Sequence, residues 1–238
     1  MSTSLAQATE HLYQTFSAYP CNPKIEGCSD SVSDFHQHLS LSGSLNTLGP
    51  DELSRYLLKT ITTAEEVEAF KYYLPRIFEL AAYSADFLID HFVIFSKLEY
   101  GHWRTWPEAE QVAIESFLWV WWKHTTRRSN GFNERLLFEI HQVSGQLESL
   151  LDQWTWSVND CAFLNFIVFL EWHLHDLQYQ KGPFKKLSKK EYSLMTNWVN
   201  SKATDFEAGF FHWERNDPSW AKRISDMLYV LEQTHLLH

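Results

Sequence analysis

Helix boundary signals follow one another along almost the entire chain, and they constrain the fold more than any other feature. A helix start shows as a polar capping residue, or as a proline with acidic residues behind it. The segments "GPDELSRYLLKT" (49–60) and "WPEAEQVAIESFLWVWWKHTTRR" (106–128) both begin in this way. Apolar residues at helical steps of three and four then mark buried stripes, as at Leu5, Ala8, Leu12 and Phe16.

Strand signals are missing, since no hairpin dipeptide joins two alternating segments. Glycine and proline number only 8 and 7, so obligatory turns are few. Two segments, Phe117–Trp122 and the middle of 157–177, are apolar on every side, which is typical of central helices. The sequence predicts an all-α protein of nine or ten helices, either a compact multi-helix bundle or an irregular α-solenoid.

Several boundaries follow from single residues. Pro75 is expected to end or kink the helix that starts near Thr62, and another helix is expected from Ser84 to about Tyr100. A short helix is weakly indicated over Val32–Leu39. Between 132 and 154 a seam for lengthwise packing on a neighbouring helix advances by steps of four and three: Leu136, Ile140, Val143, Leu147, Leu150 and Trp154.

The length of 238 residues predicts a single domain over 1–238. Residues 19–48 are expected to form an irregular N-terminal loop region, and 181–187 a linker before the C-terminal helices. No sequence repeat of fixed period is recognisable.

The net charge of −10, from 30 acidic and 20 basic side chains, argues against nucleic acid as a partner and favours a basic protein partner. No secretory signal is recognisable, and the apolar runs are shorter than a membrane span. Three cysteines, an odd number, suggest free thiols in a reducing compartment. We therefore expect a soluble, cytoplasmic protein without a membrane segment.

Cys21 and Cys28 lie in a polar loop, and His36 and His38 are the nearby residues that would complete a zinc site with them. A structural zinc site usually joins two close pairs of ligands, and no second cysteine pair follows here. Unligated thiols are the interpretation we favour, with zinc binding and an oxidative disulfide as alternatives. Cys161, in an apolar helix, is expected to be a core thiol.

Four segments, "LYQTFSAYP", "IEGC", "LSRYLLKTITT" and "FKYYLPRIFELAA", resemble a family of uncharacterised bacterial all-helical proteins. The resemblance covers roughly residues 12–85. Members of that family carry further cysteines directly after the position of Cys28, where this chain has Ser29, Asp30 and Ser31. The resemblance implies a bacterial origin and a helical architecture, and it implies no activity.

Helix-borne carboxylates and histidines form a second candidate metal site. Glu171 and His175 share one helix face at spacing i, i+4, and Asp86 and Asp90 share another. A di-iron bundle would need Glu-x-x-His on two helices. The two matches, at Glu99/His102 and Glu232/His235, are predicted to lie at helix ends; we expect capping or surface ion pairs at all of these positions.

Two further segments have alternative interpretations. Trp121 and Trp122 are expected in the core, with contact to a partner in a surface groove as the alternative. The lysine run Lys181, Lys185, Lys186, Lys189 and Lys190 is expected to be a solvated linker, with an anionic partner site as the alternative.

Nucleophile motifs and glycine-rich phosphate loops are not recognisable in the sequence. We favour a non-enzymatic protein-interaction module, adaptor or immunity-like, that works without a cofactor. The alternative is a metal-dependent enzyme or metal-binding protein that uses helix-borne Glu, His and Asp side chains in a central cleft.

Overall fold

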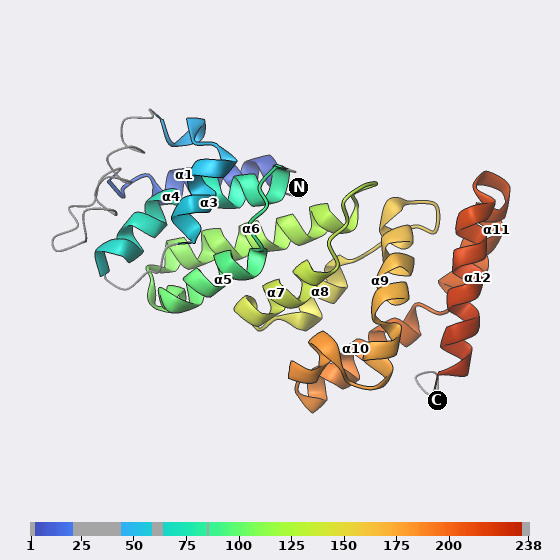
Figure 1. Ribbon diagram of the computed structural model, residues 1–238. Helices are drawn as coiled ribbons and strands as arrows, with labels where there is room; N and C mark the ends of the chain where they lie inside the picture. The colour runs from blue at the N-terminus through green and yellow to red at the C-terminus, as the bar shows by residue number, and fades with distance from the viewer. Residues whose placement is uncertain (1–2, 21–43, 59–63, 85, 235–238) are drawn as a thin grey trace. The chain divides into compact units, whose positions relative to one another are not determined.

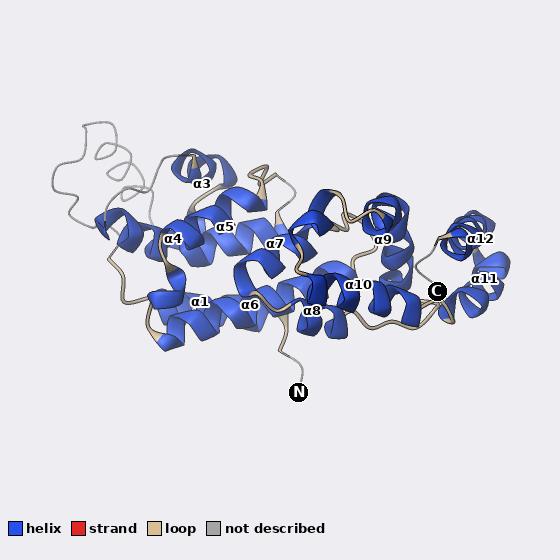
Figure 2. Ribbon diagram, turned by 90° about the horizontal axis from the view of Figure 1, so that it is seen from below, coloured by secondary structure: helices blue, strands red, loops and turns tan. Residues whose placement is uncertain are grey.

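The computed structural model describes residues 3–20, 44–58, 64–84 and 86–234, and every regular element within these ranges is helical (Figure 2). Eleven α-helices in these ranges confirm the prediction of an all-α protein (Figure 1). The helices are α1 (Leu5–Phe16), α3 (Pro50–Leu57), α4 (Ala64–Tyr83), α5 (His91–Tyr100), α6 (Glu108–Thr126), α7 (Arg135–Ser144), α8 (Leu147–Gln153), α9 (Cys161–Gln178), α10 (Lys189–Ser201), α11 (Asp205–Asn216) and α12 (Pro218–Gln233). Short 3₁₀ helices are η1 (Leu45–Thr47), η2 (Trp103–Thr105) and η3 (Gly182–Lys186).

Side-chain caps set several helix starts, as the sequence predicts. Ser4 forms a capping box with Gln7 at the start of α1, and Ser188 forms one with Glu191 at the start of α10. The carboxylate of Asp160 accepts a hydrogen bond from the backbone N–H of Phe163 at 3.1 Å and so caps α9. These bonds satisfy backbone donors that have no partner inside the helix.

Three boundaries differ from the prediction. Helix α4 does not end at Pro75 but continues to Tyr83, because fully buried residues such as Phe70 and Phe78 lie on both sides of the proline. Helix α5 begins at His91 rather than Ser84, where Asp90 supplies the cap. The seam over 132–154 is interrupted by Gly145, whose φ of +70° ends α7 in a left-handed turn. The helix suggested over 32–39 lies outside the described residues.

The chain forms two compact units, which are described separately. The first comprises residues 1–121 and 142–144, and the second comprises 122–141 and 145–238. The prediction of a single domain stays a prediction.

Aromatic side chains fill the interior of the first unit. The rings of Phe78 and Phe117 are stacked with their centroids 5.0 Å apart, and Trp121 lies 5.8 Å from Phe117. Trp106 meets Phe16 and Phe70 edge to face. Burial of such large rings is the main stabilising contribution to this core.

Trp154 is the centre of the aromatic core in the second unit. Its indole is fully buried, and its ring centroid lies 5.2 Å from that of Trp122. The ring centroids of Phe166, Phe169 and Trp198 lie between 5.5 and 6.0 Å from it. The indole Nε1–H donates to the carbonyl of Ala162 at 3.1 Å, so burial leaves this donor satisfied.

Helix α9 is buried along most of its length, as its apolar sequence predicts. Two polar side chains, Asn165 and His173, lie on its buried surface. The amide of Asn165 donates to the carbonyls of Thr126 and Arg128, each at 2.9 Å, and so caps the C-terminal end of α6. None of the helices described has both the length and the apolar character needed to cross a bilayer.

Candidate functional site

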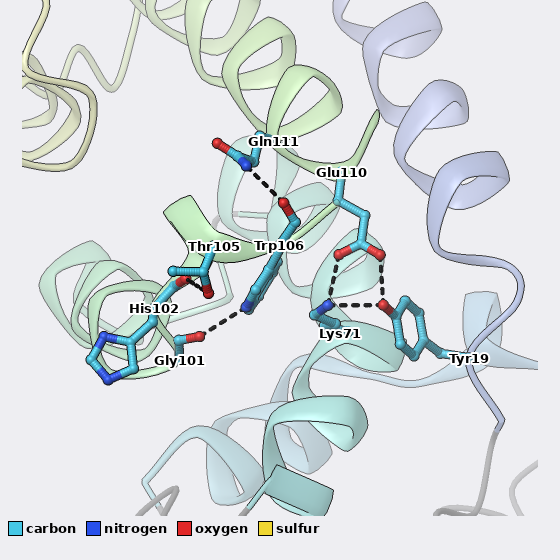
Figure 3. Close-up of polar contacts among 8 residues, drawn as sticks. All are labelled: Tyr19, Lys71, Gly101, His102, Thr105, Trp106, Glu110 and Gln111. Atoms are coloured by element: carbon cyan, nitrogen blue, oxygen red, sulfur yellow. Dashed lines mark hydrogen bonds and ion pairs between the residues drawn. The ribbon is translucent and has the colours of Figure 1, made fainter. Parts of the chain in front are cut away.

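A polar cluster is buried in the first unit, where α4 and the start of α6 meet the chain after α1 (Figure 3). Lys71 and Glu110 form an ion pair at 2.8 Å, and both side chains are less than a tenth exposed. The hydroxyl of Tyr19 donates to Glu110 Oε1 at 2.5 Å and accepts from Lys71 Nζ at 2.8 Å. Three residues far apart in the sequence thus share one hydrogen-bonded ring.

Trp106 forms a wall of this cluster. The Lys71 ammonium lies 4.3 Å from the indole ring centre and 5.0 Å from the ring of Tyr19, a cation–π arrangement. The indole Nε1–H donates to the carbonyl of Gly101 at 2.8 Å, and the Trp106 carbonyl accepts from Gln111 at 2.7 Å (Figure 3). The residue is therefore held through both its ring and its backbone.

The chemistry of the cluster is that of a closed network. Burial, and then the hydrogen bond to Glu110, raise the pKa of Tyr19, so the phenol stays protonated as a donor. Each charged group has its partner within the cluster, which leaves little capacity to bind a substrate. We interpret the cluster as a structural tie between α4 and α6.

A groove beside α1 and α4 has a cavity volume of about 390 Å³, within the range of small-molecule sites. It is lined in part by Tyr13, Arg76, Glu79, Asn46 and Tyr83. Glu79 accepts from Tyr13 at 2.6 Å and from Arg76 at 2.7 Å, and Arg76 also donates to the carbonyl of Leu48. Arg76 and Glu79 of the lining are therefore paired with each other, while Glu10, also in the lining, accepts from Gln14 at 3.0 Å. Burial, and then Glu79, raise the pKa of Tyr13.

The helix-borne candidate ligands Glu171 and His175 lie on α9 with other partners. Arg223 of α12 binds both carboxylate oxygens of Glu171, at 2.7 Å from Nε to Oε1. The His175 side chain is 72% exposed, with its ring 4.9 Å from Tyr179. Asp90 caps α5, and Asp86 is exposed. In the described part of the chain, no three His, Cys, Asp or Glu side chains are grouped as metal ligands.

The other candidate ligands, Cys21, Cys28, His36 and His38, lie outside the described residues, so the zinc site there stays a prediction. Glu99 and His102 lie at the end of α5, as expected for a helix terminus; His102 has a left-handed backbone with φ of +51°. Cys161 is a free thiol and is only partly buried.

The alternative prediction, that Trp121 and Trp122 contact a partner in a surface groove, is wrong because both side chains are buried. The two residues are 2% and 0% exposed. Trp121 contacts the rings of Phe78, Phe95 and Phe117, and the Trp122 Nε1–H donates to the carbonyl of Leu150 at 2.9 Å. Trp121 is therefore a core residue of the first unit, and Trp122 is a core residue of the second.

Negative charge is unevenly distributed along the chain. Residues 1–121 carry 16 acidic and 7 basic side chains, a net charge of −9. The remaining residues carry 14 acidic and 13 basic side chains, a net charge of −1. Almost the whole charge of −10 therefore belongs to the first unit, while the lysine run belongs to the second.

The segment 86–92, which joins α4 to α5, combines this charge with exposed apolar side chains. Leu88 is 87% exposed and Phe92 is 56% exposed, and the carboxylates of Asp86 and Asp90 flank Leu88. Asp90 Oδ1 accepts from the backbone N–H of Phe92 at 2.9 Å, and Phe87 is buried and anchors the segment. We call residues 86–92 the acidic–apolar segment.

Comparison with known proteins found no matching family model, curated protein or solved structure. The family resemblance over residues 12–85 therefore stays a prediction.

Sequence reasoning does not find the polar cluster or the exposure of the acidic–apolar segment. Tyr19 of this cluster lies 52 positions before Lys71 and 91 positions before Glu110. A helical pattern gives no signal for pairings over such separations. A signal for the segment is present in "ADFLIDHF", where acids interrupt the apolar residues at both ends. The sequence prediction places these residues in a helix that starts at Ser84, and so misses the exposed segment before His91.

Proposed function

We propose that the chain is a non-enzymatic protein-interaction module that binds a basic protein segment through the acidic–apolar segment. The observation that carries the proposal is the exposure of Leu88 and Phe92 beside two exposed carboxylates. Large apolar side chains exposed together and ringed by charge are typical of contact sites.

Charge supports a basic partner. The net charge of −9 on residues 1–121 attracts cations over about 10 Å at moderate salt, which accelerates encounter. After encounter, burial of Leu88 and Phe92 would supply affinity at about 25 cal/mol per Å² of apolar area. An adaptor or immunity-like role in a bacterium would use such a surface.

Capture from an extract of the native host tests this proposal. The wild-type chain is expected to retain a basic protein in a stoichiometric, salt-sensitive complex, and L88A/F92A is expected to lose most of it. The matched control is Glu99→Gln/Tyr100→Ala, which removes one exposed acid and one exposed aromatic at the other end of α5. Equal retention by L88A/F92A and wild type would contradict the proposal.

A further inference from the structure

We propose that the basic partner of the acidic–apolar segment is the basic–aromatic face of a second copy of this chain. The basic–aromatic face comprises the exposed side of α9 at Trp172, His175 and Tyr179, together with the lysine run that follows. This inference rests on the proposed function, whose contact segment it uses, and it names the partner.

The aromatic part of the face follows from helix spacing. Trp172, His175 and Tyr179, the C-cap of α9, recur at steps of three and four, so they share one side of the helix. Trp172 is 70% exposed and Tyr179 is 56% exposed, although α9 is buried along most of its other sides. Exposed aromatics on an otherwise buried helix offer contact area at low entropic cost.

The basic part begins immediately after α9. Lys181 Nζ lies 5.2 Å from the ring centre of Tyr179, which connects the charge to the aromatic side. Helix η3 is held in place by Phe184, which is 0% exposed, while Lys185 and Lys186 of the same helix are exposed. The lysine run is thus presented on an ordered element.

The first turn of α10 carries positive charge, although the helix dipole favours negative charge there. Lys189 and Lys190 occupy its first two positions. Glu191 lies nearby, but its carboxylate accepts from the backbone N–H of Ser188 at 2.8 Å and pairs with His141 at 3.2 Å. None of the five lysines is within ion-pair distance of a carboxylate in the ranges described. An anion would therefore find unpaired cations and the positive end of a helix together.

A second copy offers a partner of opposite charge to both the acidic–apolar segment and the basic–aromatic face. Each chain carries two exposed acids next to Leu88 in the sequence, and an exposed lysine run that begins beside Tyr179. Nucleic acid, an anionic membrane and a second copy are all opposed by the net charge of −10. We favour the second copy because most of this charge lies in the first unit, at −9, while the lysine run lies in the second unit, at −1, so unlike patches of two copies can meet. A contact between unlike patches is heterologous, so it assembles head to tail.

Sedimentation velocity of the purified full-length chain over a concentration series tests the proposal. At about 0.05 M salt the wild type is expected to sediment faster as concentration rises, and this trend is expected to disappear at about 0.5 M salt. The variants Asp86→Lys/Asp90→Asn and Lys185→Glu/Lys186→Glu are each expected to remain monomeric; the asparagine introduced in the first variant retains the cap of α5. The controls Glu10→Lys and Lys222→Glu change equally exposed charges and are expected to associate like wild type.

Mixing the two monomeric variants gives the sharpest result. One variant keeps an intact basic–aromatic face and the other an intact acidic–apolar segment, so the mixture is expected to form a 1:1 dimer and nothing larger. A wild type that stays monomeric at low salt would overturn the inference, as would a mixture that stays monomeric. Lysine-dependent binding of single-stranded RNA or of phosphatidylserine vesicles without self-association would also overturn it. None of these outcomes affects the proposed function, because capture of a basic host protein by Leu88 and Phe92 is measured independently of self-association.

Discussion

At the scale of single residues, the described core holds a few buried polar groups whose environments differ sharply. Lys71 and Glu110 neutralise each other, and Asn165 satisfies two carbonyls. His173 of α9 is 9% exposed among the rings of Phe138, Phe169 and Phe184, and neither ring nitrogen has a hydrogen-bond partner among the described residues. The energetic cost of losing a partner should differ accordingly.

Removing one member of the buried ion pair should be more damaging than removing both. Lys71→Met leaves Glu110 charged and unpaired, and we expect a loss of about 3 kcal/mol in the free energy of unfolding. Lys71→Met/Glu110→Leu removes the orphaned charge, so its stability should lie closer to that of wild type. Urea unfolding of wild type, both single variants and the double variant measures this, and a double variant as unstable as the sum of the single variants would refute it.

Burial makes His173 sensitive to acid. Burial lowers its pKa; Glu134 and Asp176 oppose that shift, whereas Arg135 reinforces it. Below the unfolded-state pKa of about 6.5, the unfolded chain binds a proton that the folded chain refuses, so stability falls as the pH is lowered. Burial lowers the pKa of His124 and His141 in the same direction, and they contribute too.

His173→Leu should therefore lose less stability than wild type between about pH 7.5 and about pH 5. The urea midpoint at the two pH values is the measurement. His175→Leu, at an exposed position on the same helix, is the control and should show the acid loss of wild type. An undiminished acid loss in His173→Leu would mean that this imidazole does not take part.

At the scale of elements, side-chain caps and packing decide where helices end. The C-terminal end of α6 depends on Asn165, which comes from α9 rather than from its own neighbours in sequence. Asn165→Ala should reduce the free energy of unfolding by about 2 kcal/mol, because one buried carbonyl and one partly buried carbonyl lose their donor. Asn216→Ala, which removes an exposed bond to the carbonyl of His212, should cost well under that in the same denaturation assay.

Gly209 marks a close approach of α11 to α9. A methyl group at this position would lie 2.4 Å from Cζ of Phe163, whose ring is fully buried. Alanine normally stabilises a helix interior by about 1 kcal/mol relative to glycine. Here we expect Gly209→Ala to destabilise by about 1–2 kcal/mol because overpacking prevails. Thermal unfolding measures this effect, and the exposed substitution Ala208→Ser is the control. A higher Tm for Gly209→Ala than for wild type would show that α9 and α11 separate to admit the methyl group.

At the scale of the whole molecule, charge distinguishes the two units. The first unit carries a net charge of −9 and the second carries −1. Repulsion among like charges destabilises a compact state, and salt screens it. Raising the salt concentration should therefore slow amide hydrogen exchange in α3, α4 and α5 more than in α9, α11 and α12. Equal slowing in both sets of helices would show that the charge imbalance has no effect on stability.

The fold class was accessible from the sequence, and the candidate contact surfaces were accessible only in part. Helix starts were accessible because a cap acts over about three residues, as Asp160, Ser188 and Asp217 do at the starts of α9, α10 and α12. The lysine run was also recognisable. Pro75 was expected to end or kink its helix. The helix does not end there, because burial of residues on both sides outweighs the lost hydrogen bond and a local rule does not count burial, while the kink stays a prediction.

The sequence by itself determined that the chain is helical, where most helices start, and that 117–122 and 157–177 contain buried helical segments. These properties depend on interactions between residues a few positions apart. Only the tertiary structure decided that Lys71, Glu110 and Tyr19 meet, that Asn165 caps α6, and that Leu88 and Trp172 face solvent. Contact and exposure at these positions depend on which helices pack against one another, and helical periodicity carries no information about that choice.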